Sequence, residues 1–185
     1  GADKAVFNLA PVVTVAPALL MFAVIPFGAQ TYLTNLNVGV LFIVAVTAVE
    51  TIGIFMAGWA SNNKYALFGA MRAVAQLVSY EIPLVISIMG VVLITGSMTL
   101  NEIVAAQSSL PLILFQPLGF IIFFIAVSAE LNRSPFDLME AESEIVAGFH
   151  TEYSGMKFVM FLTAEGISMA GYAAVMATLF LSGWV

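Results

Sequence analysis

Five long apolar windows constrain the fold of this chain more than any other feature. They lie near residues 6–27, 38–58, 73–96, 111–129 and 158–181. A helix needs about 20 apolar residues to cross roughly 30 Å of hydrocarbon, and each window is close to that length. The strands of a membrane barrel are about ten residues long and alternate in character, which these windows do not. The sequence therefore predicts an all-α, polytopic transmembrane bundle with five spans.

The composition supports a membrane protein. Hydrophobic residues make up 62% of the chain and charged residues only 9%, and the mean hydropathy is +1.06, which leaves too little polar surface for a soluble domain. No repeat, low-complexity stretch or linker divides the chain, so we expect residues 1–185 to form a single transmembrane domain.

Redox centres are not expected within the chain. It contains no cysteine, which excludes thiolate-bound iron–sulfur clusters and dithiols. Its single histidine, His150, cannot build a zinc or haem site alone, so we predict no metal site. If the protein takes part in redox chemistry, the electron carriers lie on other subunits.

The basic residues predict an orientation. In a five-span topology, all five lie on the side of the N-terminus, namely Lys4, Lys64, Arg72, Arg133 and Lys157. By the positive-inside rule this side is the cytoplasm, or the matrix or stroma of an organelle. We expect a bacterial cell membrane, with an organellar inner membrane as the alternative. Partners should dock on the polar connections of this face, and we expect none to be nucleic acid.

Acidic residues are concentrated in one segment. Residues 130–155 hold six of the 11 acids, Glu130, Asp137, Glu140, Glu142, Glu144 and Glu152. Acids clustered at a membrane boundary are typical of proteins that handle protons or cations. Ser134 as N-cap and Pro135 at the first helical position predict a short amphipathic helix from about 135 to 147, stopped by Gly148. A solvated acidic surface helix is the other interpretation.

Further acids interrupt the apolar windows. Glu50, Glu81 and Glu165 lie within windows, and Glu130 lies at the end of one. Each costs roughly 2.5 to 3.5 kcal/mol if it faces lipid, so we expect them to face the interior. Carboxyl groups removed from water hold protons more readily and titrate jointly, which favours proton handling by Glu81, Glu130 and Glu165. Neutral packing residues are the alternative, and for Glu50 the two interpretations stay open.

The window 73–96 carries two further signals. Pro83 lies two residues after Glu81 and removes a helical donor, which predicts either an ordinary kink or a hydrated hinge beside a buried acid. Arg72, Gln76 and Tyr80 follow one another at four-residue spacing. They should therefore form a polar stripe from the cytoplasmic edge into the helix.

Two motifs carry a resemblance to a known family. GWASNNKYALFGAMRAVAQLVSYEIPL spans residues 58–84, and NRSPFDLMEAESEIVAGFHTEYSGMKF spans residues 132–158. Together they resemble the H subunits of proton-translocating NADH:quinone oxidoreductase, respiratory complex I, and the similarity extends over the whole chain. Members of that family look like eight-helix subunits. The resemblance therefore implies that these five spans match the second to sixth helices, with the first and last two absent.

The resemblance also implies a function. In the family this subunit forms the membrane wall of the quinone chamber and starts the line of carboxylates that couples quinone reduction to proton pumping. Quinone is then the substrate, while NADH, FMN and iron–sulfur clusters are expected on partner subunits only. Hydrophilic quinone-site subunits would dock on the cytoplasmic face, beside small membrane subunits and lipid. The proton-path acids correspond to Glu81, Glu130 and Glu165, and the charged positions around the chamber to Arg72, Arg133, Asp137, Glu140, Glu142, Glu144 and Glu152.

No role follows for two residues. Glu50 lies where the family often lacks a carboxylate, and His150 is interpreted as a loop residue.

Two alternatives to the complex I function stay open. One is the equivalent subunit of a membrane-bound hydrogenase or a cofactor F420 dehydrogenase, and the other is an independent proton or cation transporter.

Overall fold

The fold is a bundle of long apolar helices. The computed structural model describes residues 3–136 and 148–185. Within these residues, four helices are long and apolar enough to cross a membrane, α1 (Lys4–Met21), α2 (Gly39–Ala60), α3 (Lys64–Thr95) and α7 (Gly155–Phe180). Shorter elements are α4 (Leu100–Ala106), α5 (Pro117–Glu130) and the 3-10 turns η1 (Leu112–Leu114) and η3 (Gly148–His150). The predicted all-α, polytopic bundle is confirmed.

The window predicted at 111–129 forms a shorter helix than expected. Residues 112–114 make the separate turn η1, and α5 begins at Pro117 and has 14 residues. Proline lacks the backbone N–H, so Pro117 suits the first turn of a helix but not its interior. At 1.5 Å per residue α5 is about 21 Å long, less than the roughly 30 Å of a hydrocarbon core.

Helix α3 is longer than its predicted window of 73–96. It has 32 residues and begins at Lys64, because the side chain of Asn63 caps it by accepting a hydrogen bond from the Tyr65 N–H at 2.9 Å. Gly96, with φ of 70°, ends it in the left-handed conformation that favours glycine. The helix continues through Pro83. Pro83 has no N–H to donate to the carbonyl of Ser79, four residues earlier. The Ser79 hydroxyl donates to the Ala75 carbonyl at 2.6 Å, so it does not replace that missing bond.

The acidic helix expected from about 135 to 147 lies almost wholly outside the described residues. Of its first residues, Pro135 lies in a turn and Phe136 outside any helix. Asp137, Glu140, Glu142 and Glu144 also lie outside the described part of the chain.

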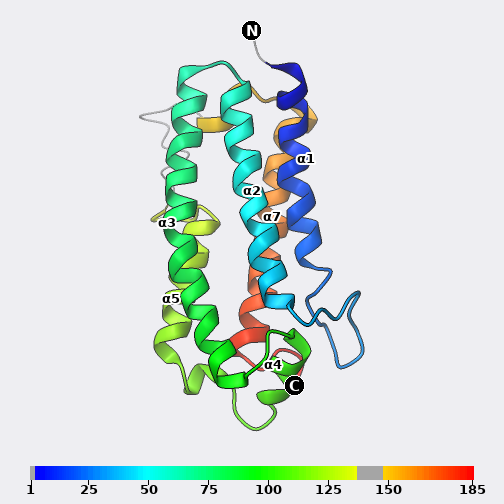
Figure 1. Cartoon of the computed structure of the whole chain (residues 1–185). Helices are drawn as coiled ribbons and strands as arrows, with labels where there is room; N and C mark the ends of the chain where they lie inside the picture. The colour runs from blue at the N-terminus through cyan, green and yellow to red at the C-terminus, as the bar shows by residue number, and fades with distance from the viewer. Residues whose placement is uncertain (1–2, 137–147) are drawn as a thin grey trace.

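The four long helices run side by side (Figure 1). Helix α1 packs against α2 and α7, α2 against α3, and α3 against α5. One end of the bundle carries the N-terminus, the α2–α3 connection and η3, and the other carries the α1–α2 connection, α4 and the C-terminus (Figure 1). The α2–α3 connection and η3 belong to the two motif-bearing segments, 58–84 and 132–158. They lie at the same end of the bundle, as the predicted topology requires.

Tyr153 joins the segment after η3 to α1 at the end of the bundle that carries the N-terminus. Its ring stacks on Phe7 of α1 with ring centroids 4.0 Å apart, and its hydroxyl donates to the Phe7 carbonyl at 2.8 Å. Burial raises the pKa of Tyr153, so the hydroxyl stays protonated and able to donate. The segment after η3 is thereby held on α1.

Candidate functional site

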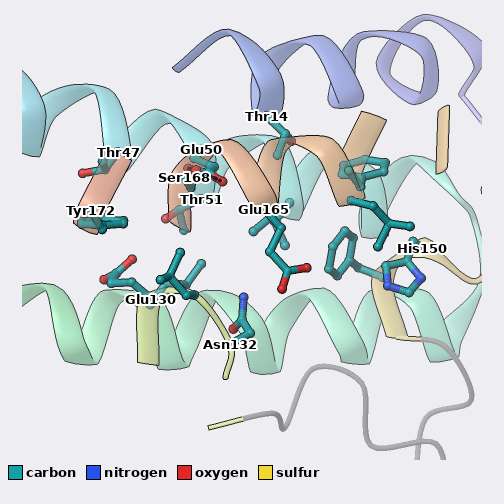
Figure 2. A pocket seen from close by; sticks show the side chains of 16 residues that line it. Thr14, Thr47, Glu50, Thr51, Glu130, Asn132, His150, Glu165, Ser168 and Tyr172 are labelled. Carbon is teal, nitrogen blue, oxygen red and sulfur yellow. Dashed lines mark hydrogen bonds between the residues drawn. The ribbon is translucent and has the colours of Figure 1, made fainter. Parts of the chain in front are cut away.

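A polar cavity lies inside the bundle, among α1, α2, α3, α5, η3 and α7 (Figure 2). Its volume is about 50 Å³. Carboxyl, hydroxyl, amide and imidazole groups line it together with a few apolar side chains. The lining residues are Thr14, Thr47, Glu50, Thr51, Ile54, Leu77, Glu130, Leu131, Asn132, Phe149, His150, Phe161, Leu162, Glu165, Ser168 and Tyr172.

The cavity lies part-way along the bundle. Gln76 of α3 donates to the Ala129 carbonyl near the end of α5 at 2.8 Å. At a rise of 1.5 Å per residue, Gln76 lies about 18 Å along α3 from Lys64. Glu130 and the turn at 131–136 therefore lie beside the middle part of α3 and not beside its first turn. The physical reason is that α5 has only 14 residues.

Three carboxyl groups meet at the cavity. Glu50 comes from α2, Glu130 from the end of α5 and Glu165 from α7. Ser168 of α7 donates its hydroxyl to both carboxyl oxygens of Glu50, at 3.2 and 3.1 Å. Because the three carboxyl groups line one cavity, a negative charge on one of them disfavours a negative charge on the others.

Arg133 brings a positive charge to this cluster. Its Nη2 lies 3.8 Å from Glu165 Oε1 and 3.3 Å from the sulfur of Met169. The Arg133 side chain is 53% exposed and that of Glu165 34% exposed. Solvent screens a pair of this kind, so it contributes at most about 1 kcal/mol to stability.

Glu81, the third acid predicted for the proton path, lies outside this cavity. It lines a separate open groove of about 330 Å³ between α2 and α3, with Ala48, Thr51, Ile52, Phe55, Val74 and Val78. Thr51 lines both spaces. The structure thus brings Glu130 and Glu165 to one cavity and places Glu81 beside it.

The other predicted site residues that the structure describes lie nearer the end of the bundle that carries the N-terminus. Glu152 follows η3 and accepts a hydrogen bond from the Asn63 side chain at 2.6 Å, which ties this loop to the start of α3. Arg72 lies on α3, half-buried, about one helical turn before Gln76. His150 of η3 is buried at the end of the cavity away from Tyr172 (Figure 2).

Sequence reasoning missed several residues of the cavity. Glu50 was left without a role, and Ser168 and Tyr172 were not singled out. Glu165, Ser168 and Tyr172 are three and four residues apart, which places them on one face of a helix, and this spacing was the available signal. Figure 2 shows Tyr172 between Thr47 and Glu130, at the end of the cavity away from His150.

Comparisons with known proteins place the chain in a family. The whole chain, residues 1–185, matches the NADH dehydrogenase family. It is 61% identical over 183 residues to the H subunit of the NADH-quinone oxidoreductase of Dehalococcoides mccartyi strain CBDB1, covering 99% of this chain and 52% of the relative. It is 56% identical over 183 residues to the protein of the same name from Bacillus cytotoxicus, covering 99% of this chain and 55% of the relative. The chain thus spans about half the length of these relatives. These matches confirm the resemblance that the two motifs carry, and the chain belongs to the NADH dehydrogenase family.

Proposed function

We propose that the chain acts as a membrane subunit of proton-translocating NADH:quinone oxidoreductase, complex I, and starts the path that couples quinone reduction to proton pumping. The observation that carries this proposal is the cavity on which Glu50, Glu130 and Glu165 meet from three helices. The names of the relatives support the assignment to this enzyme.

The size of the cavity suits water. A water molecule needs about 10–15 Å³ of such volume and two to four polar partners. The roughly 50 Å³ available therefore holds about three to five waters. Carboxyl groups joined by water and by hydroxyls such as those of Ser168 and Tyr172 form a chain along which protons pass.

The shared linings suggest how the path continues. Thr51 lines both the groove of Glu81 and the cavity of Glu130 and Glu165, so the two spaces adjoin. We assign Glu50 to the path because it lines the same cavity as Glu130 and Glu165, two of the three acids selected from the sequence. A change in the charge of one member then alters proton occupancy along the whole series.

The quinone headgroup binds elsewhere in this proposal, since a ring system is far larger than a cavity for a few waters. We place it on the cytoplasmic side, where the loop at 131–154 meets hydrophilic partner subunits that carry FMN, iron–sulfur clusters and the NADH site. Arg72, Arg133 and Glu152 belong to this charged wall, as do the four acids between 137 and 144. By the positive-inside rule this face is cytoplasmic in a bacterial cell membrane.

Purification in mild detergent tests the assignment. A tagged chain expressed in its host membrane is isolated, and the co-purifying proteins are identified by mass spectrometry. We expect the subunits that bind NADH and iron–sulfur clusters, together with quinone reductase activity. Recovery with hydrogenase or F420 dehydrogenase subunits would assign the chain to a related complex, and recovery of the chain alone would favour an independent transporter. Either result would overturn the proposal.

A further inference from the structure

The polar stripe on α3 contacts the turn that follows α5. Gln76 and Tyr80 are one helical turn apart, so both lie on the same face of α3. Gln76 is 8% exposed and reaches the segment at 129–136. The ring of Tyr80 meets that of Phe136 edge-on, with centroids 5.0 Å apart. Two successive residues of the stripe therefore hold the same turn.

The side-chain amide of Gln76 makes three of these contacts. Its Nε2 lies 2.8 Å from the Ala129 carbonyl, 3.0 Å from Asn132 Oδ1 and 3.0 Å from the Phe136 carbonyl. An amide nitrogen has two N–H groups, so two donors serve three acceptors and one bond is shared. If the amide were rotated by half a turn, its oxygen would face these three oxygen acceptors and could not form hydrogen bonds with them. The surroundings therefore fix the orientation of the amide.

Both local and outside bonds hold the turn. Asn132 has φ of 52°, in the left-handed region, which asparagine adopts more readily than other residues apart from glycine. Backbone bonds from Asn132 to Ala129 and from Arg133 to Ser128 close the turn locally. Gln76 adds the bonds that join the turn to α3, which is the neighbouring helix at this depth.

This turn carries groups of the cavity. Glu130 directly precedes it, Asn132 lines the cavity and Arg133 reaches Glu165. We propose that Gln76 is a positioning residue. By holding the turn on α3, it sets where Glu130 and Asn132 enter the cavity and where Arg133 meets Glu165. The positioning stands on geometry alone, and its effect on turnover rests on the proposed function.

The test removes the amide and keeps the length of the side chain. Gln76→Met is made in the full assembled complex, together with a reporter cysteine at Leu131, which is 8% exposed. The chain has no cysteine of its own, so the modified peptide is assigned by mass spectrometry. Gln116→Met is the matched control, because Gln116 also donates across helices to a backbone carbonyl, that of Gly90 at 2.7 Å. It joins α3 to the start of α5, about 21 Å along α3 from Gln76.

We expect maleimide to label the cysteine at 131 roughly tenfold faster in Gln76→Met, the effect of losing one or two ordinary hydrogen bonds. In Gln116→Met the rate should match that of the reporter alone. Quinone reduction in Gln76→Met should show a lower kcat with an unchanged KM for quinone. Unchanged labelling, or equal labelling in both variants, would overturn the inference. Faster labelling with a normal kcat would uphold the positioning and count against the proposed role of Glu130.

Discussion

Replacing Arg133 by alanine separates a functional effect from a folding effect. Arg133 pairs with Glu165 at 3.8 Å, and more than half of its side chain is exposed. Exposed pairs contribute about 0 to 1 kcal/mol, so the loss of stability should stay below about 1 kcal/mol. Assembly of the complex should therefore be retained.

The same magnitude limits the effect on turnover. A loss of about 1 kcal/mol in the interaction between Arg133 and the charged form of Glu165 changes a rate by about fivefold, since about 1.4 kcal/mol is a factor of ten. We expect quinone reduction in Arg133→Ala to fall by about two- to fivefold, which corresponds to about 0.4 to 1 kcal/mol. Electron transfer from NADH to ferricyanide should persist, because that acceptor does not need the membrane site.

The assay compares both activities in the same membranes, with the amount of assembled complex measured on a native gel. Arg133→Lys is the control for charge, because lysine keeps the cation without the guanidinium geometry. It should retain more activity than Arg133→Ala. Equal loss of quinone and ferricyanide activity would indicate failed assembly and refute the reasoning, and so would full quinone activity in Arg133→Ala.

Two further predictions test the topology and the packing. Cysteines at Asn62 and Ser154 should be labelled only from the cytoplasmic face and one at Thr34 only from the opposite face, and labelling of Asn62 and Thr34 from the same side would exclude this topology. A Cβ at Gly69 would lie 2.8 Å from the backbone of η3, whereas one at Gly166 would meet nothing within 4 Å. Gly69→Ala should therefore cost about 1–3 kcal/mol, measured as thermal stability of the complex in detergent, and Gly166→Ala should cost nothing. Equal stability of the two variants would contradict the close approach of η3 to α3.

Hydropathy and the positions of charged residues predicted the bundle and which connections share an end. They did not predict the length of α5. Pro111 and Pro117 were visible within the window at 111–129, but only packing decides whether such prolines break a helix or kink it. A short α5 lowers Glu130 into the bundle, and the sequence alone could not indicate that depth.

The composition of the cavity could be predicted only in part. Each buried acid was evident from its charge in an apolar window, but the rotation of a helix about its axis decides which space that acid faces. Glu50 faces α7, where Ser168 binds it, and Glu81 faces the groove between α2 and α3. Apart from the polar stripe of Arg72, Gln76 and Tyr80, the windows were almost uniformly apolar, so no amphipathic pattern fixed the rotation of the other helices.

Replacing Glu130 by glutamine tests most directly the central claim, that the acids of the cavity carry protons. Glu130→Gln keeps the shape of the side chain and removes the proton that titrates, and a neutral amide at depth costs less than a charge, so assembly should be retained. The measurement is quinone-linked turnover and proton pumping in the same vesicles, with Glu130→Asp as the conservative variant. The account predicts that turnover and pumping fall together in Glu130→Gln and that Glu130→Asp keeps part of both. Normal turnover and normal pumping in Glu130→Gln, and likewise in Glu50→Gln and Glu165→Gln, would show that these acids are neutral packing groups and would contradict the account.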